Sequence, residues 1–299
     1  MTVAHTPNRP SVLAMDIGGT HFRMGLCSPE GKLLVHQRLD TASIKDPREA
    51  LSMLASQVDP HSEAATAVAG VPGVVDHDTG TILHAPNLPA DFVPRLSAAA
   101  IAQAVGRPAR IVNDADLAAI GEAYLGAAAG KPSMSYVTIS TGIGAGVVIR
   151  GRLLHGTLSL AELGHSFIFA GQATPEGAGS VEWAASGTAL HRQAEAEGLD
   201  LGNPEIVRAA VEGTEPEASL LGAVISAAAV AVANMAHLFS TEIIVLGGGL
   251  SLADKSIIAR IADKAVSLAP PYLSLQIVPA ALGDDAALVG ASRAADALD

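Results

Sequence analysis

A pattern of strand, glycine turn and strand occurs twice in this chain, and it constrains the fold more than any other feature. In the first copy, an apolar run meets Gly18-Gly19-Thr20, and a second apolar run ends at Cys27. In the second copy, a run that begins at Met134 meets Gly142-Ile143-Gly144 and returns as a strand to Ile149. Apolar runs bounded by glycine-containing turns are typical of hairpins. We therefore expect two related halves that face each other.

Helical patterns lie between the strands in both halves. Asp46-Pro47 resembles a capped helix start, and apolar residues follow it at helical spacing to Val58. Further helices are expected over Leu96–Val105, after Asn113-Asp114 and over Ala286–Leu298. Short apolar runs predict four more strands, at Ala65–Ala69, Arg110–Val112, Glu242–Leu246 and Leu275–Val278. The alternation of strands and helices indicates an α/β fold.

Composition narrows the class of protein. The chain has 299 residues, which predicts two domains. Hydrophobic residues make up 49% and charged residues 16%, a balance that excludes intrinsic disorder. The net charge is −12 and no dense basic run occurs, so nucleic acid is not an expected partner. The single cysteine, Cys27, cannot form an internal disulfide, which favours a reducing, cytoplasmic location.

Two segments bear on targeting. Residues 1–10 are polar, so we expect a short flexible tail without the apolar core of a signal peptide. The segment 218–241 carries no charged residue and is long enough to span a bilayer. It is rich in alanine and contains Ser226, Asn234 and His237, so a helix buried between protein layers is the better interpretation. No membrane is expected as a partner.

Three glycine turns follow predicted strands and have the chemistry of phosphate-binding turns. Glycine lets backbone N–H groups approach an anion closely, and a neighbouring threonine adds a hydroxyl group. In the first turn, Asp16 stands where a carboxylate could hold Mg²⁺ through water. The residues expected to bind the nucleotide are Asp16, Gly18, Gly19, Thr20, Thr141, Gly142, Gly144, Gly247, Gly248 and Gly249. Together the turns predict a nucleotide cleft between two domains.

Short motifs along nearly the whole chain resemble those of the ROK sugar kinases, the repressor, open-reading-frame and kinase family. In chain order they are D-I-G-G-T (Asp16–Thr20), G-V-P-G-V-V-D (Gly70–Asp76), P-N-L (Pro86–Leu88), N-D-A (Asn113–Ala115), S-T-G-I-G-A-G (Ser140–Gly146), A-E-L-G-H (Ala161–His165), V-E-W-A-A-S-G (Val181–Gly187) and G-G-G-L-S (Gly247–Ser251). The resemblance implies an actin-like ATPase fold of two α/β domains on ribonuclease-H-like cores, with the nucleotide and sugar in the cleft. We expect residues 11–114 and 285–299 in a smaller domain and 115–284 in a larger one.

The resemblance also implies a reaction, the transfer of a phosphoryl group from ATP to a sugar hydroxyl, usually at C6 of a hexose. Asp114 matches the catalytic base of the family, and Mg²⁺ neutralises phosphate charge in such reactions. The positions that match sugar-binding residues are Gly73, Asn87, Asn113, Glu162, His165 and Glu182. A homodimer is likewise expected, with the uncharged helix near Ala223–Phe239 as a candidate interface.

One departure from the family concerns zinc. ROK proteins usually carry a C-x-C-G-x-x-G-C-x-E loop, and Ala173, Pro175 and Ser180 replace its three cysteines here. These side chains cannot act as thiolate ligands, so we predict no structural zinc. The departure leaves open how the loop that carries Glu182 is held rigid.

Several alternatives remain open at this stage. Glucose is the first candidate substrate because G-V-P-G and P-N-L resemble the glucokinase branch; mannose, fructose, allose and N-acetylated hexosamines, such as N-acetylmannosamine and N-acetylglucosamine, are alternatives. Polyphosphate is an alternative phosphate donor. A sugar-sensing repressor would need an N-terminal helix-turn-helix, and about ten residues before the first strand are too few for one. A non-catalytic sugar-binding protein is the remaining alternative, although Asp114 and the glycine turns argue against it.

Overall fold

The computed structural model describes residues 10–159, 162–174, 177–269, 272–273 and 275–298. The chain forms two compact units. Unit 1 comprises Met1–Gly126, Gly151–Leu160 and Asp284–Asp299, and unit 2 comprises Ala127–Arg150 and Ala161–Gly283. Apart from Pro10, the expected tail lies outside the described residues.

The main sheet of unit 1 contains five strands in the order β3-β2-β1-β4-β7. They are β1 (Ser11–Ile17), β2 (His21–Cys27), β3 (Leu33–Asp40), β4 (Ala64–Val71) and β7 (Ala109–Asn113). β1 pairs antiparallel with β2 and parallel with β4, and β4 pairs parallel with β7. The hairpin of β5 (Val74–Asp76) and β6 (Thr81–His84) and the short strand β10 (Arg152–Leu153) also belong to this unit.

Unit 2 repeats this arrangement. Its strands are β8 (Ser133–Ile139), β9 (Ile143–Ile149), β11 (Ile243–Gly247) and β12 (Gln276–Pro279), in the order β9-β8-β11-β12. β8 pairs antiparallel with β9 and parallel with β11, and β11 pairs parallel with β12. This order matches β2-β1-β4-β7 of unit 1, so the expected relation between the two halves is confirmed at the level of strand order.

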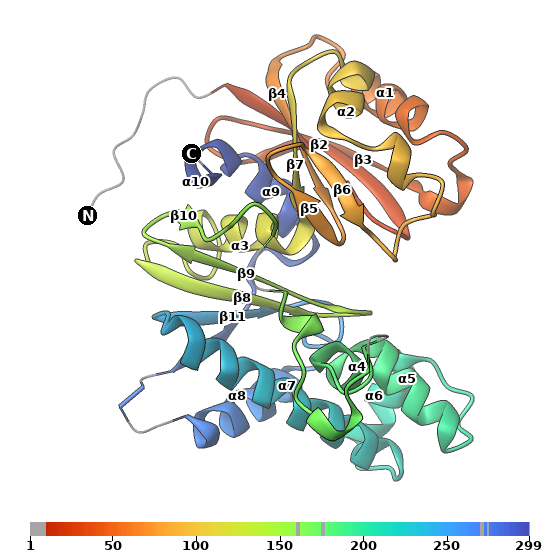
Figure 1. Ribbon diagram of the computed structural model, residues 1–299, viewed down its shortest axis with the longest axis vertical. Coiled ribbons are helices and arrows are strands. Elements are labelled where there is room, and N and C mark those ends of the chain that lie inside the picture. Colours follow the sequence, from red (N-terminus) through yellow and green to blue (C-terminus); the bar gives the residue numbers. More distant parts are fainter. Residues whose placement is uncertain (1–9, 160–161, 175–176, 270–271, 274, 299) are drawn as a thin grey trace. The chain divides into compact units, whose positions relative to one another are not determined.

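Helices cover both faces of the unit 1 sheet (Figure 1). They are α1 (Pro47–Val58), α2 (Ala98–Val105), α3 (Asp114–Tyr124), α9 (Ala286–Ala291) and α10 (Ala294–Leu298), with 3-10 turns at Thr41–Ser43 and Val93–Arg95. Leu13, Met15 and Ile17 of β1 share one buried cluster with Leu51 and Leu54 of α1, whereas α9 contacts the other face. The predicted start of α1 is confirmed, because the Asp46 carboxylate accepts a hydrogen bond from the Arg48 N–H.

In unit 2 the helices are α4 (Val181–Ala185), α5 (Gly187–Ala196), α6 (Asn203–Val211), α7 (Glu217–Phe239) and α8 (Lys255–Leu268), with 3-10 turns at Leu163–His165 and Ala170–Gln172. Among the described residues, α7 alone has the length and composition of a membrane span. It packs against α4, α5, α6 and α8, and most of its apolar side chains are buried in these contacts. Its neighbours within unit 2 account for its apolar composition, and the expected dimer interface on this helix stays a prediction.

The division between the units differs from the expected one at 114/115. Helix α3 and the segment Gly151–Leu160 belong to unit 1. Two glycines bring α3 against α9: a Cβ on Gly290 would lie 1.8 Å from the Leu117 carbonyl oxygen, and one on Gly121 would lie 2.4 Å from that of Ala286. Because only glycine permits this approach, α3 is held by the carboxyl-terminal segment of unit 1.

The closing helix expected over Ala286–Leu298 is interrupted, which corrects the prediction. The Ser292 hydroxyl donates to the Val289 carbonyl oxygen at 2.6 Å, and the Arg293 N–H bonds to Gly290 rather than continuing the α-helical pattern. A serine that bonds to its own backbone competes with the helix, so α9 ends and α10 begins after a turn.

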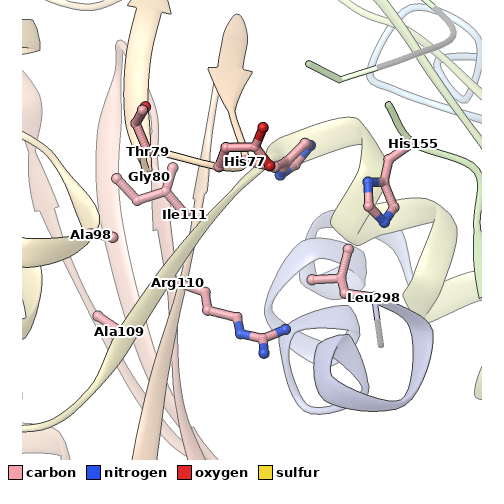
Figure 2. A pocket seen from close by; sticks show the side chains of 10 residues that line it. His77, Thr79, Gly80, Ala98, Ala109, Arg110, Ile111, His155 and Leu298 are labelled. Atoms are coloured by element: carbon pink, nitrogen blue, oxygen red, sulfur yellow. The ribbon is translucent and has the colours of Figure 1, made fainter. Parts of the chain in front are cut away.

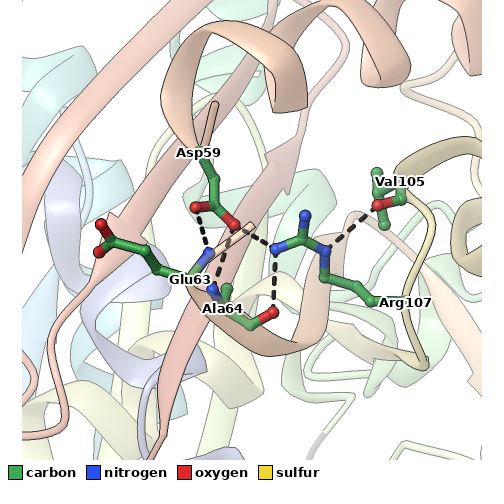
Figure 3. Close-up of polar contacts among 5 residues, drawn as sticks. All are labelled: Asp59, Glu63, Ala64, Val105 and Arg107. Atoms are coloured by element: carbon green, nitrogen blue, oxygen red, sulfur yellow. Dashed lines mark hydrogen bonds and ion pairs between the residues drawn. The ribbon is translucent and has the colours of Figure 1, made fainter. Parts of the chain in front are cut away.

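A buried ion pair joins the end of α1 to the segment before β7 (Figure 3). Arg107 pairs with Asp59, whose carboxylate also accepts the N–H groups of Glu63 at 2.8 Å and Ala64 at 3.2 Å. The Asp59 side chain is 1% exposed. Burial raises the pKa of Asp59, but the hydrogen bonds from Arg107 and the two N–H groups outweigh it and hold the pKa below 3.8. The charged form is therefore the stable one in the folded protein.

We expect Arg107→Ala to destabilise the protein by about 3–5 kcal/mol, because it leaves the Asp59 charge buried without its partner. Since the pKa of Asp59 is depressed on folding, the stabilisation of the wild type is complete above 3.8 and is lost as the pH falls below that value. Urea unfolding of both proteins across this range is the measurement. Arg48→Ala, which removes an exposed pair, is the matched control, and an equal loss there would contradict the prediction.

Candidate functional site

The carboxyl ends of β1, β4 and β7 meet at one edge of the unit 1 sheet and bring predicted site residues together. Asp16 lies opposite Gly70 on β4, and Gly70 lies opposite Val112 on β7. A Cβ on Gly70 would lie 3.5 Å from the Cα of Asp114, so the strand passes close to the proposed base. Ligands of open α/β sheets bind at this edge, outside the carboxyl ends of the strands.

The first glycine turn is fixed by its backbone contacts. The Gly18 N–H donates to the His21 carbonyl oxygen at 2.9 Å, and the Thr41 hydroxyl donates to the Gly18 carbonyl oxygen at 2.7 Å. A Cβ on Gly19 would lie 2.0 Å from the carbonyl oxygen of Asn87. The structure therefore places the turn directly against Asn87, a predicted sugar-binding residue. Gly19 and Thr20 are both exposed, as a ligand-binding turn requires.

Asp16 is the last residue but one of β1, and its carboxylate is partly buried, with the side chain 24% exposed. Burial is the main cause that raises its pKa above 3.8, the Arg23 guanidinium opposes this, and the nearby Asp284 adds to it. A hard cation such as Mg²⁺ takes oxygen ligands and usually keeps several waters. One accessible carboxylate beside a glycine turn fits an ion held through water, so Asp16 fits the role predicted for it.

Asn113 and Asp114 begin α3 with different roles. The Asn113 side-chain oxygen caps the helix by accepting the N–H groups of Ala115 at 2.9 Å and Asp116 at 3.2 Å, and its amide nitrogen donates to the Gly73 carbonyl oxygen at 2.9 Å. Asn113 thus holds the G-V-P-G loop against the start of α3. Its expected sugar contact stays a prediction, because these bonds use most of its polar capacity. Asp114 is only half-buried.

Position and charge suit Asp114 to accept a proton. It is the first residue of an 11-residue helix, where the helix dipole favours a negative charge. One oxygen of its carboxylate accepts the N–H of Ala115 at 2.8 Å, which orients the group. The carboxylate is therefore held at the strand edge in a defined orientation.

In unit 2 the other two glycine turns lie at one edge of the second sheet. The turn at Thr141–Gly144 follows β8, and Gly247–Gly249 ends β11, with Gly247 opposite Thr138 in the parallel pair. Gly248 has φ +91°, and a Cβ there would lie 2.5 Å from the Ile139 carbonyl oxygen. Nothing lies within 4 Å of a Cβ placed on Gly249. Gly248 therefore serves the packing of the two turns, whereas Gly249 borders open space.

Helix α5 supports the Thr141 turn through residues that sequence reasoning missed. The N–H and the hydroxyl of Thr188 both donate to the Thr141 carbonyl oxygen, at 3.2 and 2.8 Å. The Gly187 N–H donates to the Ser140 carbonyl oxygen at 2.7 Å, and the Asn203 amide donates to the Gly187 carbonyl oxygen at 2.9 Å. The bonds of Thr188 reach a turn 47 residues away in sequence, the Asn203 bond joins residues 16 apart, and no motif marks Thr188 or Asn203.

The predicted sugar-binding side chains of unit 2 gather beside the same turn. One Glu182 oxygen, Oε2, accepts the Ile143 N–H at 2.8 Å, and a Cβ on Gly164 would lie 3.4 Å from that oxygen. His165 Nε2 lies 3.9 Å from Glu162 Oε2, and both side chains are partly exposed. The structure therefore brings Glu162, His165 and Glu182 to one region of unit 2.

The loop that precedes Glu182 is held by hydrogen bonds within the chain. Ser180, at the third cysteine position, caps α4 by accepting the Trp183 N–H at 3.2 Å. The Val181 N–H donates to the Ser166 carbonyl oxygen at 2.8 Å, and the Phe169 N–H donates to that of Gly179 at 3.0 Å. These hydrogen bonds hold the described part of the loop in place next to Glu182.

Ala173 is described, whereas Pro175 lies outside the described residues. Within the described part of the chain, no three His, Cys, Asp or Glu residues are placed to hold a metal ion. The absence of structural zinc stays a prediction from the sequence.

A cavity of about 450 Å³ lies elsewhere in unit 1, at the start of β7 (Figure 2). His77, Arg110 and His155 line it, and the two histidine rings are 5.2 Å apart between centroids. Burial is the main cause that lowers the pKa of His77, and His155 lowers it further. β7 runs from this cavity to Asp114 at its opposite end, and none of the predicted site residues lines the cavity.

Comparisons with known proteins agree with this geometry. Residues 12–297 match the sequence profile of the ROK family. A glucokinase of Thermotoga maritima is 30% identical over 310 residues, covering 94% of this chain and 96% of its own. An N-acetylmannosamine kinase of Vibrio cholerae is 29% identical, covering 94% and 97%. The crystal structure of a ROK family glucokinase from Streptomyces griseus, in complex with glucose and AMPPNP, has 26% identity and a TM-score of 0.78, covering 94% and 98%.

The two adjacent glycines of the third turn allow a matched test. We expect Gly248→Ala to destabilise the protein by at least about 1–3 kcal/mol, because alanine is strained at positive φ and its Cβ would meet Ile139. Gly249→Ala has open space and is expected to leave stability unchanged while weakening nucleotide binding. Urea unfolding and AMPPNP titration measure the two effects. Equal stability losses in both variants would contradict this assignment.

Ser180→Ala removes the cap of α4, and we expect it to cost about 1 kcal/mol of stability and to weaken sugar binding. The control is Ser97→Ala, which removes the equivalent cap of α2, where Ser97 accepts the Ala100 N–H at 3.1 Å. We expect the control to lose similar stability without losing sugar affinity. Sugar affinities that fall equally in both variants would show that the effect of Ser180 is not specific to the Glu182 loop.

Proposed function

Because this chain belongs to the ROK family over residues 12–297, we propose that it transfers the γ-phosphoryl group of ATP to the C6 hydroxyl of a hexose, with Asp114 as the base. The chain is a sugar kinase with the actin-like ATPase fold. The choice of sugar, of hydroxyl and of base is the proposal. The main support for the proposal is the position of Asp114. It begins α3 at the edge of the unit 1 sheet where Asp16 and the glycine turn beside Asn87 also lie.

Asp114 would accept the proton of the attacking hydroxyl as the oxygen–phosphorus bond forms and the bond to the leaving ADP breaks. Phosphoryl transfer depends mainly on positioning and charge stabilisation, so one oriented carboxylate is sufficient for this step. The capping bonds of Asn113 keep the helix start fixed, and with it the carboxylate of Asp114.

The glycine turns would hold the phosphate groups through backbone N–H groups and the hydroxyls of Thr20 and Thr141. When bound at Asp16, Mg²⁺ would supply positive charge to the phosphates. Polyphosphate as an alternative donor shares this phosphate chemistry, and comparison of the two donors in one assay separates them.

The sugar would contact Gly73, Asn87 and Asn113 in unit 1 and Glu162, His165 and Glu182 in unit 2. Carboxylates suit pairs of adjacent hydroxyls, because each oxygen can accept a hydrogen bond. Glucose is the first candidate, in line with the glucokinase relatives, and N-acetylmannosamine is the second, because a relative of similar identity carries that name.

The experiment that tests the function measures sugar-dependent ADP formation with Mg·ATP. The panel contains glucose, mannose, fructose, allose, N-acetylglucosamine and N-acetylmannosamine. Turnover on one or two sugars would support the proposal and identify the substrate. No turnover on any sugar, with folded protein and with polyphosphate also tried, would favour the non-catalytic sugar-binding alternative.

We further propose that the protein is cytoplasmic, in line with its single cysteine, and that it has no nucleic-acid partner, in line with its net charge of −12. We also propose that it forms a homodimer, as the family resemblance implies. Sedimentation at working concentrations tests the dimer, and a monomer throughout would refute it.

For Asp114→Asn we expect turnover to fall by about 10²–10⁴-fold with little change in sugar and AMPPNP affinity, because only proton acceptance and a charge are removed. Steady-state kinetics and calorimetric titration are the measurements. Asp78→Asn, an exposed carboxylate of the same unit, is the matched control and should retain activity. Near-normal turnover in Asp114→Asn would refute the assignment of the base.

A further inference from the structure

Arg23 lies beside Asp16 because the strand register places it there. In the antiparallel pair of β1 and β2, Asp16 is directly opposite Arg23. Opposite residues in such a pair point to the same face of the sheet. On this face Cys27 contacts Leu288 of α9, whereas Leu13 and Met15 point to the other face and pack with α1. Asp16 and Arg23 therefore point to the side of the sheet that α9 covers.

The Arg23 guanidinium makes contacts on two sides. Its Nη1 lies 3.6 Å from Asp16 Oδ2, close enough for an ion pair but longer than a hydrogen bond. The same nitrogen donates to the Asp284 carbonyl oxygen, and Nη2 pairs with the Asp285 carboxylate. The Arg23 side chain is 17% exposed, so these contacts are largely shielded from solvent. One guanidinium thus joins the end of β1 to the segment that starts α9.

This connection reaches the proposed base as well. Helix α9 packs against α3 through Gly290 and Gly121, and α3 begins with Asp114. Arg23 connects Asp16 to the segment that starts α9, and α3 packs against α9. Both carboxylates of the unit 1 edge are therefore positioned against one element.

We propose that Arg23 is a positioning residue for the magnesium–nucleotide complex, holding Asp16 beside the first glycine turn through its contacts with Asp284 and Asp285. The proposal rests on the proposed function, because it concerns the residue expected to hold the ion. Its physical basis is charge and geometry. Arg23 forms an ion pair with Asp16, and the long contact leaves the Asp16 carboxylate partly accessible to water. Neighbours that orient a metal-binding group typically affect metal affinity by about 10–100-fold.

The test measures the affinity for AMPPNP by calorimetry, once with Mg²⁺ and once with EDTA. The affinity with Mg²⁺ divided by the affinity with EDTA is the magnesium-dependent gain. In Arg23→Gln we expect this gain to fall about tenfold, while the metal-free affinity stays close to that of the wild type. Arg23→Lys, which retains the charge but not the fork of donors, should recover part of the gain. Arg38→Gln is the matched control, because Arg38 is exposed and lies opposite Arg23 on β3.

Asp285→Asn removes one partner of Arg23 and keeps Arg23 itself, so it tests the proposal even if Arg23→Gln does not fold. We expect a smaller loss of the gain in the same direction. Retention of the full gain in both Arg23→Gln and Asp285→Asn, or an equal loss in Arg38→Gln, would overturn the proposal. A wild type without any magnesium-dependent gain would overturn the proposed function, and this inference with it, whereas a gain that survives in the variants overturns only the role of Arg23.

Discussion

The turns at the candidate site depend on glycines that lie so close to another segment that a Cβ would overlap with it. A Cβ on Gly19 would lie 2.0 Å from the Asn87 carbonyl oxygen, and one on Gly73 would lie 2.0 Å from that of His84. In unit 2 the same holds for Gly248 against Ile139, and Gly142 faces the Glu182 carboxylate. At Gly19, Gly73 and Gly248 the obstructing atom belongs to the backbone, so any other residue would push the two backbone segments apart, whereas at Gly142 the Glu182 side chain would have to move. These glycines therefore let predicted nucleotide and sugar residues lie against each other.

Sequence reasoning predicted the parts of the fold that local signals specify. The start of α1 was predictable because Asp46 and Pro47 carry capping information within a few residues, and the repeated hairpins were predictable because alternating apolar runs meet glycine turns. The break between α9 and α10 was missed, since it depends on a single serine hydroxyl that bonds to its own backbone. Segment 115–124 lies in unit 1 and not with the larger domain expected from the sequence, because it packs against Gly290, a contact between segments far apart in the chain.

The candidate site shows the same limit. Motifs identified Asp16, Asp114 and Glu182 because their neighbours in sequence form recognisable patterns. Thr188 and Asn203, which support the Thr141 turn, and Arg23, which contacts Asp16, carry no such pattern. Asn113 illustrates a different difficulty: the motif marks it as a sugar contact, while its side chain is already bonded to Gly73 and to the start of α3. A residue type in a motif does not show how its hydrogen-bonding capacity is divided between structure and ligand.

The loop before Glu182 shows how a site can be held without thiolate ligands. A structural zinc ion contributes about 10–16 kcal/mol in zinc-finger peptides, whereas a helix cap contributes about 1 kcal/mol, so Ser180 alone is no equivalent substitute. The position of Glu182 therefore depends on additional bonds, and the one from the Ile143 N–H comes from the second glycine turn itself. Because a predicted sugar ligand and a predicted phosphate turn share this hydrogen bond, displacement of Ile143 is transmitted directly to Glu182. The geometry of the predicted sugar-binding carboxylate therefore depends on that of the predicted nucleotide-binding turn.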